Sequence, residues 1–378
     1  MRRISLPILL VLSLFLVQCS STKNVSTHIL DTQTINSQTV TTLTETTSQV
    51  ENIILMIGDG MGVSQVYAGI TANNGLNLEK AQYVGFSKTY SANRYVTDSA
   101  AGGTALATGV KTNNGAIGVD ADGNAVKSIL EHAAENGLAT GIIASCAITH
   151  ATPASFVAHQ PSRNMQEEIA LDIVNSDVTL FIGGGRDFFN KRKDNRNLLE
   201  NLKGKGFQIA LDMEAVNNAN QGKLAGLVSE GHQPGYTERG DFLPESTQKA
   251  LELLSNHPEG FFLMVEASQI DWAGHANDTE FAVNEMLDFD RAIKIAFDYA
   301  DKNPGTLVVV TADHETGGMS LIGGDKAKGE VKAEWGTTGH TAVMVPVFAY
   351  GTAAKEFAGI YENTDIFKKL MKLYSFDK

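Results

Sequence analysis

Seven acidic and imidazole side chains in this sequence have the types and spacing of metal ligands. Asp271 and His275 are four residues apart, so a single helical turn would bring both to one ion. Asp313 and His314 offer an oxygen and a nitrogen from adjacent residues. Mixed histidine and carboxylate ligands suit Zn²⁺, whereas sets of oxygen ligands suit Mg²⁺. Each residue taken singly could be a surface charge or a helix cap, but gathered together they would repel one another unless cations neutralised them. The full set is Asp59, Glu266, Asp271, His275, Asp313, His314 and His340.

Ser99 is a candidate nucleophile, because it stands at the start of a run of small residues, 100–108, that is predicted to be a helix. Backbone N–H groups and the dipole at a helix N-terminus favour an anion there. The octapeptide 97–104 by itself favours a simpler reading, in which Ser99 only caps the helix. No histidine lies near it in the sequence to act as a base, but a bound metal could activate the hydroxyl instead.

A third segment, around His150, contains groups that could bind phosphate and a hard cation. Thr152 offers a hydroxyl to a cation such as Mg²⁺. Arg163 offers a planar fork that matches two phosphate oxygens, although a surface ion pair is the alternative. We expect His159 to be a satisfied core histidine. The remaining histidines appear incidental from their sequence contexts: His28, His132, His232 and His257.

The elements that would position these residues follow an alternating pattern of short apolar runs and helical segments. This pattern predicts an α/β fold with a central, mostly parallel β-sheet flanked by helices on both faces. Asp59, Glu266 and the pair Asp313–His314 each come just past or at the carboxyl end of a predicted strand, which is the edge where such sheets bind ligands. The expected strands are 52–57, 140–145, 180–182, 261–265, 307–311 and 345–350, and the expected helices are 100–108, 248–254, 280–299 and 365–374.

Length, composition and charge limit the function further. The chain has 378 residues, 43% of them hydrophobic, which is enough for one large α/β domain or two smaller ones. Its formal charge of −13 argues against a nucleic acid partner, because phosphate neutralisation along a strand needs many Lys and Arg residues. With two cysteines, Cys19 and Cys146, the chain is neither a disulfide scaffold nor a cysteine-based zinc protein.

The N-terminus predicts export. Arg2 and Arg3 precede an apolar run, 6–17, that is too short to span a bilayer, so residues 1–19 are predicted to be a signal peptide. Residues 16–19 resemble a bacterial lipobox, which would make Cys19 a lipid anchor; ordinary cleavage nearby is the alternative. Ser and Thr make up 15 of the 31 residues 20–50, which predicts a flexible tether. The protein would then be periplasmic, an outer-membrane lipoprotein or secreted.

Six motifs occur in one order along the chain: IGDGMG (57–62), TDSAAG (97–102), HATPA (150–154), VEASQID (265–271), TADHETGG (311–318) and GHT (339–341). In them the sequence resembles the bacterial alkaline phosphatases, and the resemblance covers the chain from residue 52 to its end. It implies a catalytic domain over 51–378, with a short crown-like insertion at about 319–338.

The resemblance also implies a role for each residue. Ser99 would become phosphoserine and Arg163 would clamp the phosphate. Two Zn²⁺ and one Mg²⁺ would be bound. The first zinc would take Asp271, His275 and His340. The second would take Asp59, Asp313 and His314. The magnesium would take Asp59, Thr152 and Glu266. His150 and Trp272 stand at substrate-binding positions that vary within the family, so phosphate contact, magnesium affinity and turnover could differ here.

The predicted function is therefore broad hydrolysis of small phosphate monoesters by a monomer or homodimer. A related phosphodiesterase or sulfatase, and an exported metal- or phosphate-binding lipoprotein without turnover, are the alternatives. Only 8 residues are proline and 36 are glycine, which predicts a heat-labile, cold-adapted enzyme.

Overall fold

The computed structural model describes residues 49–220 and 222–376 and contains a ten-stranded sheet. The predicted signal peptide, Cys19 and nearly all of the predicted tether lie outside the described residues. Val50 is buried in the core, so the folded part includes it. The strands of the sheet are β1 (Asn52–Gly58), β2 (Tyr83–Lys88), β3 (Ala139–Ala147), β4 (Leu180–Gly184), β5 (Phe207–Ala210), β6 (Lys223–Leu227), β7 (Phe261–Ala267), β8 (Thr306–Thr311), β13 (Val345–Gly351) and β14 (Gly359–Glu362).

The sheet is mostly parallel, as the sequence predicts. Its strand order is β14-β2-β13-β8-β1-β7-β3-β4-β6-β5, and β13 runs antiparallel to both of its neighbours. The register places Ile57 of β1 beside Glu266 of β7 and beside Thr311 of β8. The carboxyl ends of these three central strands therefore meet at one edge, where parallel sheets bind ligands.

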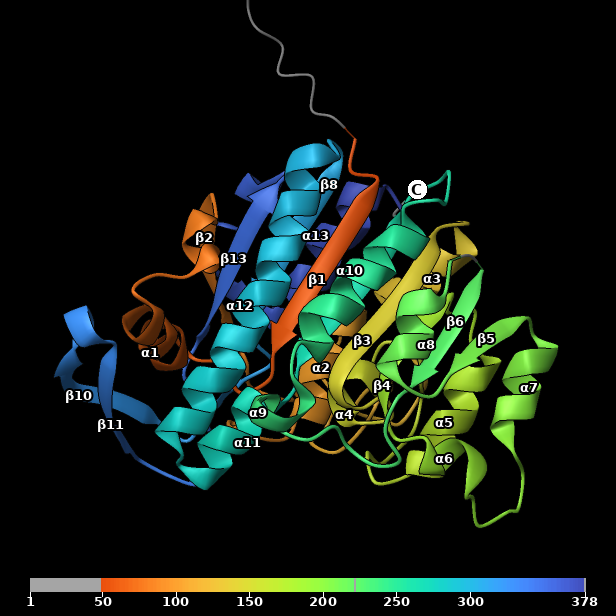
Figure 1. Ribbon diagram of the computed structural model, residues 1–378, viewed down its shortest axis with the longest axis horizontal. Helices are drawn as coiled ribbons and strands as arrows, with labels where there is room; N and C mark the ends of the chain where they lie inside the picture. Colours follow the sequence, from red (N-terminus) through yellow and green to blue (C-terminus); the bar gives the residue numbers. More distant parts are fainter. Residues whose placement is uncertain (1–48, 221, 377–378) are drawn as a thin grey trace, which may run out of the picture. The chain divides into compact units, whose positions relative to one another are not determined.

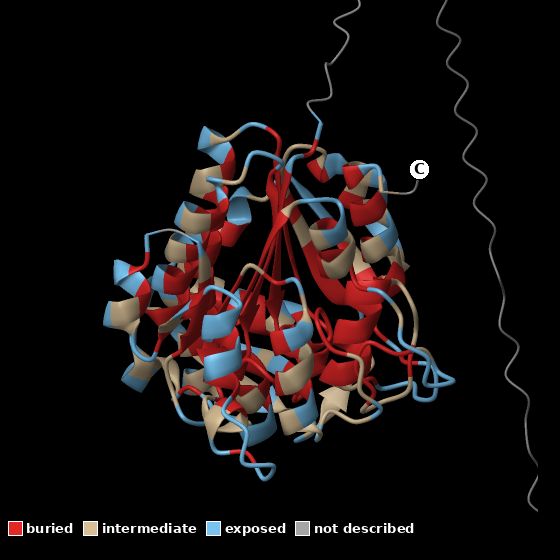
Figure 2. Cartoon of the chain, turned by 90° about the vertical axis from the view of Figure 1, so that its right-hand side faces the viewer, coloured by how far each residue is buried: buried red, intermediate tan, exposed pale blue. Residues whose placement is uncertain are grey.

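Both faces of the sheet are covered, because alternate residues of its strands belong to different cores. Ile53 and Leu55 pack into one apolar cluster, and Ile54 and Met56 pack into the other. Figure 1 shows α10 and α12 crossing one face, and Figure 2 shows the buried strands between the helical layers. The helices are α1 (Val63–Asn73), α2 (Ser99–Thr108), α3 (Ile129–Glu135), α4 (Ala151–Ala154), α5 (Gln166–Asn175), α6 (Asp187–Asn190), α7 (Leu198–Gly204), α8 (Met213–Asn218), α9 (Tyr236–Arg239), α10 (Phe242–Leu254), α11 (Gln269–Ala276), α12 (Thr279–Lys302) and α13 (Asn363–Tyr374).

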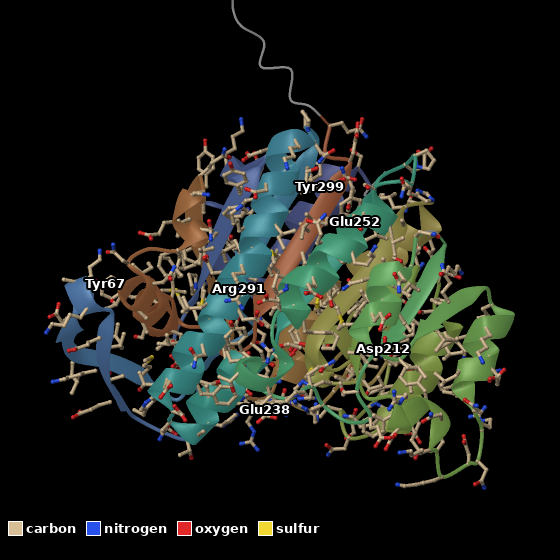
Figure 3. All side chains as sticks on the ribbon, in the orientation of Figure 1. Tyr67, Asp212, Glu238, Glu252, Arg291 and Tyr299 are labelled. Carbon is tan, nitrogen blue, oxygen red and sulfur yellow. The ribbon has the colours of Figure 1, made fainter. Side chains whose placement is uncertain are left out.

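Charged side chains occupy the outer surface of the layer formed by α10 and α12. Glu252 on α10 and Arg291 on α12 are examples (Figure 3). The inner side of α12 is apolar, as its sequence periodicity predicts, with Met286 and Phe289 fully buried. In the described part of the chain, no helix combines the length and apolar content needed to cross a bilayer.

Two small two-stranded sheets lie outside the main one. Residues 319–335 form a hairpin of β10 (Met319–Asp325) and β11 (Glu330–Trp335) beside α1 (Figure 1). At the base of this hairpin, β9 (Glu315–Thr316) pairs with β12 (His340–Thr341). That pairing returns the chain from the hairpin to the carboxyl edge of β8, where the ring of His340 stacks on that of His314 with centroids 3.6 Å apart.

Candidate active site

The acidic residues after the central strands are buried together at the carboxyl edge of the sheet. Asp59 follows β1, Glu266 lies near the end of β7, and Asp313 with His314 follows β8. All four side chains have no solvent exposure. A group of buried carboxylates without enough positive partners is costly, so this cluster itself indicates a cation site.

One group consists of Asp59, Asp313 and His314, whose ligand atoms lie within 4.8 Å of one another. The Nε2 atom of His314 is 3.4 Å from Oδ1 of Asp59 and 3.4 Å from Oδ2 of Asp313. Those two buried oxygens have no hydrogen-bond partner among the described residues. Burial and neighbouring carboxylates raise the pKa of Asp59 well above its usual value and that of Asp313 to about 7. The group is short of positive charge, and its nitrogen and oxygen ligands fit Zn²⁺.

A second group consists of Asp271, His275 and His340. Helix α11 places Asp271 and His275 one turn apart, as the sequence predicts. The Nδ1 atom of His275 is 2.6 Å from the carbonyl oxygen of Thr338, and Nδ1 of His340 is 2.9 Å from that of Thr97. Donation to these carbonyls places the Nδ1 proton and leaves the Nε2 lone pairs free for a metal.

Those Nε2 lone pairs converge. The two Nε2 atoms are 3.1 Å apart and lie 3.3 and 3.4 Å from Oδ1 of Asp271. Asp271 raises the pKa of His275 to about 9, so its carboxylate draws either a proton or a metal cation to Nε2. Burial opposes the charged form of His340, but Asp271 outweighs it and raises that pKa also. The pocket between the three side chains thus attracts positive charge, and its donor set again fits Zn²⁺.

The residues predicted to hold magnesium also come together. The hydroxyl of Thr152 donates to Oδ2 of Asp59 over 3.3 Å. Oε1 of Glu266 is buried without a partner among the described residues, and burial raises the pKa of this carboxyl to about 7. The three side chains offer oxygen ligands, which suit Mg²⁺. The thiol of Cys146, buried as a small hydrophobe, lies 3.6 Å from Oε2 of Glu266.

Ser99 is the first residue of α2, and it does not cap that helix. The simpler reading of the octapeptide is wrong, because Asp98 is the N-cap and its Oδ1 accepts from the backbone N–H of Ala101 over 3.0 Å. The hydroxyl of Ser99 is free to face the site, and its Oγ lies 3.1 Å from Nε2 of His314. A histidine distant in sequence therefore stands beside the serine, between it and the two carboxylates.

Arg163 lies between Asp98 and His150. Its Nη1 is 3.3 Å from Oδ2 of Asp98, and its Nη2 is 3.1 Å from Nε2 of His150. Because a guanidinium only donates, His150 accepts with Nε2 and is neutral; burial and the charge of Arg163 lower its pKa to about 3. The fork therefore stands beside the N-terminus of α2, where a phosphate on Ser99 would lie.

Trp272 and a residue that the sequence analysis missed complete this side of the site. Trp272, half-buried on α11, lies edge-on to His150 with ring centroids 6.3 Å apart. His232, which the sequence context made incidental, packs edge-on against Trp272 at 5.0 Å and against His150 at 5.7 Å. It belongs to a loop of Gly, Gln and Pro residues, and nothing in that loop's sequence indicates a ring partner.

His159 is a satisfied histidine, as predicted, but it is half-buried and does not belong to the core. Its Nδ1 lies 2.6 Å from the carbonyl oxygen of Gly118, and its Nε2 lies 2.9 Å from Oε1 of Glu131.

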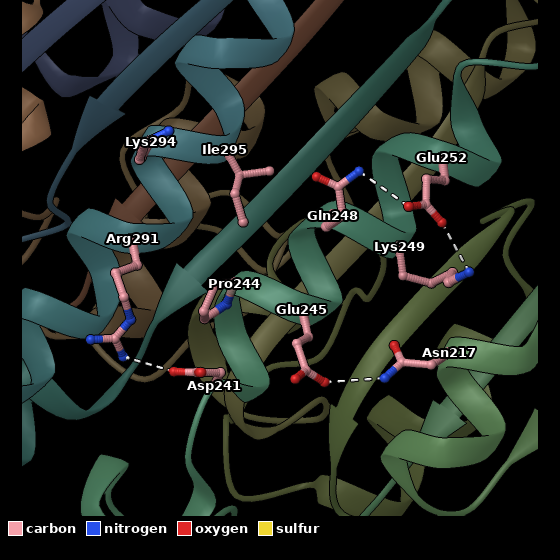
Figure 4. A pocket seen from close by; sticks show the side chains of 10 residues that line it. All are labelled: Asn217, Asp241, Pro244, Glu245, Gln248, Lys249, Glu252, Arg291, Lys294 and Ile295. Carbon is pink, nitrogen blue, oxygen red and sulfur yellow. Dashed lines mark hydrogen bonds and ion pairs between the residues drawn. The ribbon is translucent and has the colours of Figure 1, made fainter.

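A cavity of about 610 Å³ lies away from this chemistry, between α10 and α12 (Figure 4). Its charged side chains already pair with neighbours, as Arg291 does with Asp241 and Lys249 with Glu252. The buried ligand groups identify the active site instead.

Comparison with known proteins identifies the family of the chain. The family model for alkaline phosphatase matches residues 50–333 and 322–376. This chain belongs to the alkaline phosphatase family. It is 35% identical to alkaline phosphatase 4 of Bacillus subtilis, over 84% of this chain and 87% of that protein. It is 32% identical to the alkaline phosphatase of Escherichia coli, over 84% of each chain.

A solved structure resembles it as well. The alkaline phosphatase of the Antarctic bacterium TAB5 is 42% identical, covers 87% of this chain and 98% of its own, and superposes with a TM-score of 0.82. A mutant of that enzyme has been solved with Mg bound in its M3 site. As a member of the alkaline phosphatase family, this chain is a metal-dependent hydrolase of phosphate monoesters.

Proposed function

We propose that the protein is a broad-specificity alkaline phosphatase that works through a phosphoserine intermediate and uses two Zn²⁺ and one Mg²⁺. The observation that carries the proposal is the convergence of the Ser99 hydroxyl, the Arg163 fork and two mixed groups of histidine and carboxylate ligands at one edge of the sheet. Asp271, His275 and His340 would hold the first zinc, and Asp59, Asp313 and His314 the second. Asp59, Thr152 and Glu266 would hold the magnesium, and the choice of this metal is supported by a related enzyme, a TAB5 mutant that has Mg bound in its M3 site.

When bound, the zinc ions would supply positive charge to the attacking and leaving oxygens of an in-line displacement. Ser99 Oγ attacks the phosphorus, the bond from phosphorus to the ester oxygen breaks, and the alcohol leaves with a proton. Water then attacks the phosphoserine, the bond between Ser99 Oγ and phosphorus breaks, and phosphate leaves while the serine regains its proton. Each displacement needs mainly positioning, which the residues of this site would provide, and charge neutralisation, which Arg163 and the bound metal ions would provide.

The chain's own groups position the phosphoryl oxygens. The guanidinium of Arg163 presents parallel N–H donors that match two non-bridging oxygens. Free backbone N–H groups at the start of α2 add donors beside Ser99. A monoester has these non-bridging oxygens to spare, whereas a diester loses one to its second substituent. The geometry therefore favours phosphate monoesters as substrates.

The test is p-nitrophenyl phosphate hydrolysis at alkaline pH by the wild type and by Ser99→Ala, before and after chelation and with zinc and magnesium added back. We expect turnover that depends on the metals and falls by at least about 10³-fold in Ser99→Ala, as for removal of a nucleophile. Ser320→Ala, at an exposed position on β10, is the matched control and should retain full activity. Full activity in Ser99→Ala would refute the phosphoserine mechanism.

The same preparation tests the alternatives. Rates on a phosphate monoester, a phosphate diester and a sulfate ester should be highest for the monoester. A higher rate on the diester would favour a phosphodiesterase. Binding of phosphate by the metal-loaded wild type without turnover would favour a binding protein.

We also propose that the protein is exported and is anchored by a lipid on Cys19, in the periplasm or the outer membrane. Support comes from the sequence of residues 1–19, which lie outside the described part of the chain. Mass spectrometry of the mature N-terminus tests this: a diacylglyceryl cysteine would support the anchor, and an unmodified N-terminus beyond residue 19 would refute it. A monomer or a homodimer is expected by light scattering.

A further inference from the structure

We propose that His232 is a positioning residue of the phosphate site, which holds the rings of Trp272 and His150 and through them the phosphate clamp Arg163. The inference rests on the proposed function, and it extends the site to a loop that none of the family motifs contains. The three rings are mutually edge-on: His232 meets Trp272 at 87°, His232 meets His150 at 81°, and His150 meets Trp272 at 84°. Edge-on packing is a preferred arrangement of aromatic rings and fixes their relative orientation.

The imidazole of His232 is itself anchored to the sheet. Its Nδ1 accepts a hydrogen bond of 3.1 Å from the backbone N–H of Ala147, the last residue of β3. This bond fixes the tautomer, because Nδ1 accepts and the proton of the neutral ring must be on Nε2. The ring therefore cannot flip without leaving the N–H of Ala147 without its acceptor.

The loop that carries His232 is fastened on both sides. The carbonyl of the preceding residue, Gly231, accepts from the backbone N–H of Gly185 over 2.6 Å. On the other side, the amide of Gln269 donates to the carbonyls of Gln233 and Pro234 over 2.9 and 3.1 Å. Gln269 is the first residue of α11, the helix that also carries Trp272. Loop and helix thus hold His232 and Trp272 in a fixed relation.

The position of the His232 ring affects Arg163 through His150. The Nη2 atom of Arg163 donates to Nε2 of His150 over 3.1 Å, and Nη1 pairs with Asp98, so the orientation of the fork depends on where the His150 ring stands. His150 lies on a short loop before α4, and its Nδ1 has no partner among the described residues. Besides the hydrogen bond from Arg163, its ring is held by contacts with the other two rings, of which His232 is the one that is hydrogen-bonded to the sheet.

Two substitutions separate the roles of the ring and its nitrogen. His232→Asn keeps an acceptor for Ala147 but removes the ring, so the Michaelis constant and the inhibition constant of inorganic phosphate should rise about 3- to 10-fold, with a smaller change in kcat. His232→Phe keeps the ring but loses the acceptor, so it should lower stability and leave the phosphate constants closer to those of the wild type. His257→Asn is the matched control. His257 precedes β7, at the amino-terminal edge of the sheet, so this substitution should change neither the phosphate constants nor the stability.

A readout without turnover uses Trp272, because the chain has only one other tryptophan, Trp335. In a Trp335→Phe background, His232→Asn should increase acrylamide quenching of Trp272 and weaken the fluorescence response to inorganic phosphate. Unchanged phosphate constants and unchanged quenching in a folded His232→Asn protein would overturn the proposal. Absence of turnover in the metal-loaded wild type would instead refute the phosphatase mechanism, while the phosphate titration would still test His232.

Discussion

The ring nitrogens of individual histidines distinguish a ligand from a structural residue in this protein. His275 and His340 each have one nitrogen on a backbone carbonyl and the other facing a second imidazole and a carboxylate. That arrangement suits a metal, because the proton is confined to Nδ1 and the Nε2 lone pairs converge. His159 differs, since both of its nitrogens face oxygen acceptors. The protonated imidazole of His159, which has two N–H donors, is the form that satisfies both oxygen acceptors.

His159 should therefore make the stability of the protein depend on pH. The hydrogen bond with Glu131 raises the pKa of His159, whereas the pKa of Glu131 is lowered by His159 and Ser128 against an opposing effect of burial. The histidine's contribution is complete below its unfolded pKa of about 6.5 and is lost as pH rises through its raised folded pKa. The glutamate's contribution is complete above about 4.5 and is lost as pH falls through its lowered folded pKa.

We expect His159→Gln to lower the free energy of unfolding more at pH 6 than at pH 9. The difference should be at most about 1 kcal/mol, because both side chains are partly exposed to solvent. Urea unfolding at the two pH values measures it, with His257→Gln as the control for a histidine without this ion pair. An equal loss at both pH values would show that the charged pair contributes nothing.

At the scale of elements, six strands of the main sheet were predictable because burial on both faces gives continuous apolar runs. All ten elements expected from the sequence are present, with ends shifted by at most three residues except in α10, which begins six residues earlier than expected. Strands β2, β5, β6 and β14 of this sheet were missed, as were strands β9 to β12 outside it and all helices other than α2, α10, α11, α12 and α13. β5 and β14 have only four residues each, and β2 and β14 have exposed positions, so their patterns are weak. The antiparallel direction of β13 could not be predicted either, since an apolar run has the same pattern in either direction.

The candidate site was predictable where a motif places a ligand at the end of a strand, as for Asp59 and Asp313. His232 was not predictable, because its partners come from β3, α11 and the segment before α4.

The partners of Arg239 on α9 were not predictable either. This residue forms a buried ion pair with Glu285 and Asp288 on α12. Its guanidinium lies 2.5 Å from Oε2 of Glu285 and 2.7 Å from Oδ2 of Asp288, and the three side chains are at most 1% exposed.

Arg239→Ala should lower the free energy of unfolding by about 3–5 kcal/mol, because two carboxylates would remain buried with too little positive charge. Equilibrium unfolding in urea measures this loss. Adding Glu285→Gln and Asp288→Asn to Arg239→Ala should recover part of it, since the buried negative charge is then gone. Lys191→Ala, which removes an exposed ion pair with Asp187 and Glu230, is the control and should change stability little. A loss in Arg239→Ala no larger than in that control would refute the argument.

For the whole molecule, the distribution of glycine and proline bears on thermal stability. Proline restricts the backbone conformations of the unfolded chain, but the chain has only 8 prolines. Its 36 glycines increase the conformational entropy of the unfolded chain. Many glycines are required by their backbone, since they adopt positive φ angles in turns. A few others, such as Gly204, have neither a positive φ nor a neighbour that an added Cβ would meet, so they add only to the entropy lost on folding. The metal-loaded protein is therefore expected to unfold below about 70 °C, close to the mesophilic range or lower.

Two neighbouring glycines test this explanation directly. Gly204 is the last residue of α7, has an ordinary helical backbone and would have open space around an added Cβ. Gly206, two residues later, also has open space, but its φ is +85°. Gly204→Ala should raise the free energy of unfolding by about 0.5–1 kcal/mol, because alanine reduces the entropy of the unfolded chain.

Gly206→Ala should instead lower the free energy of unfolding by about 1 kcal/mol, because a side chain strains a left-handed backbone. The two variants differ in backbone conformation and not in packing space, so calorimetry of the pair isolates the contribution of chain entropy. Opposite shifts of the unfolding temperature would support the entropic origin of heat lability. A lower unfolding temperature in both variants would mean that the fold requires Gly204. Equal rises in both would show that the backbone conformation of the glycine does not decide the effect, and the explanation would fail.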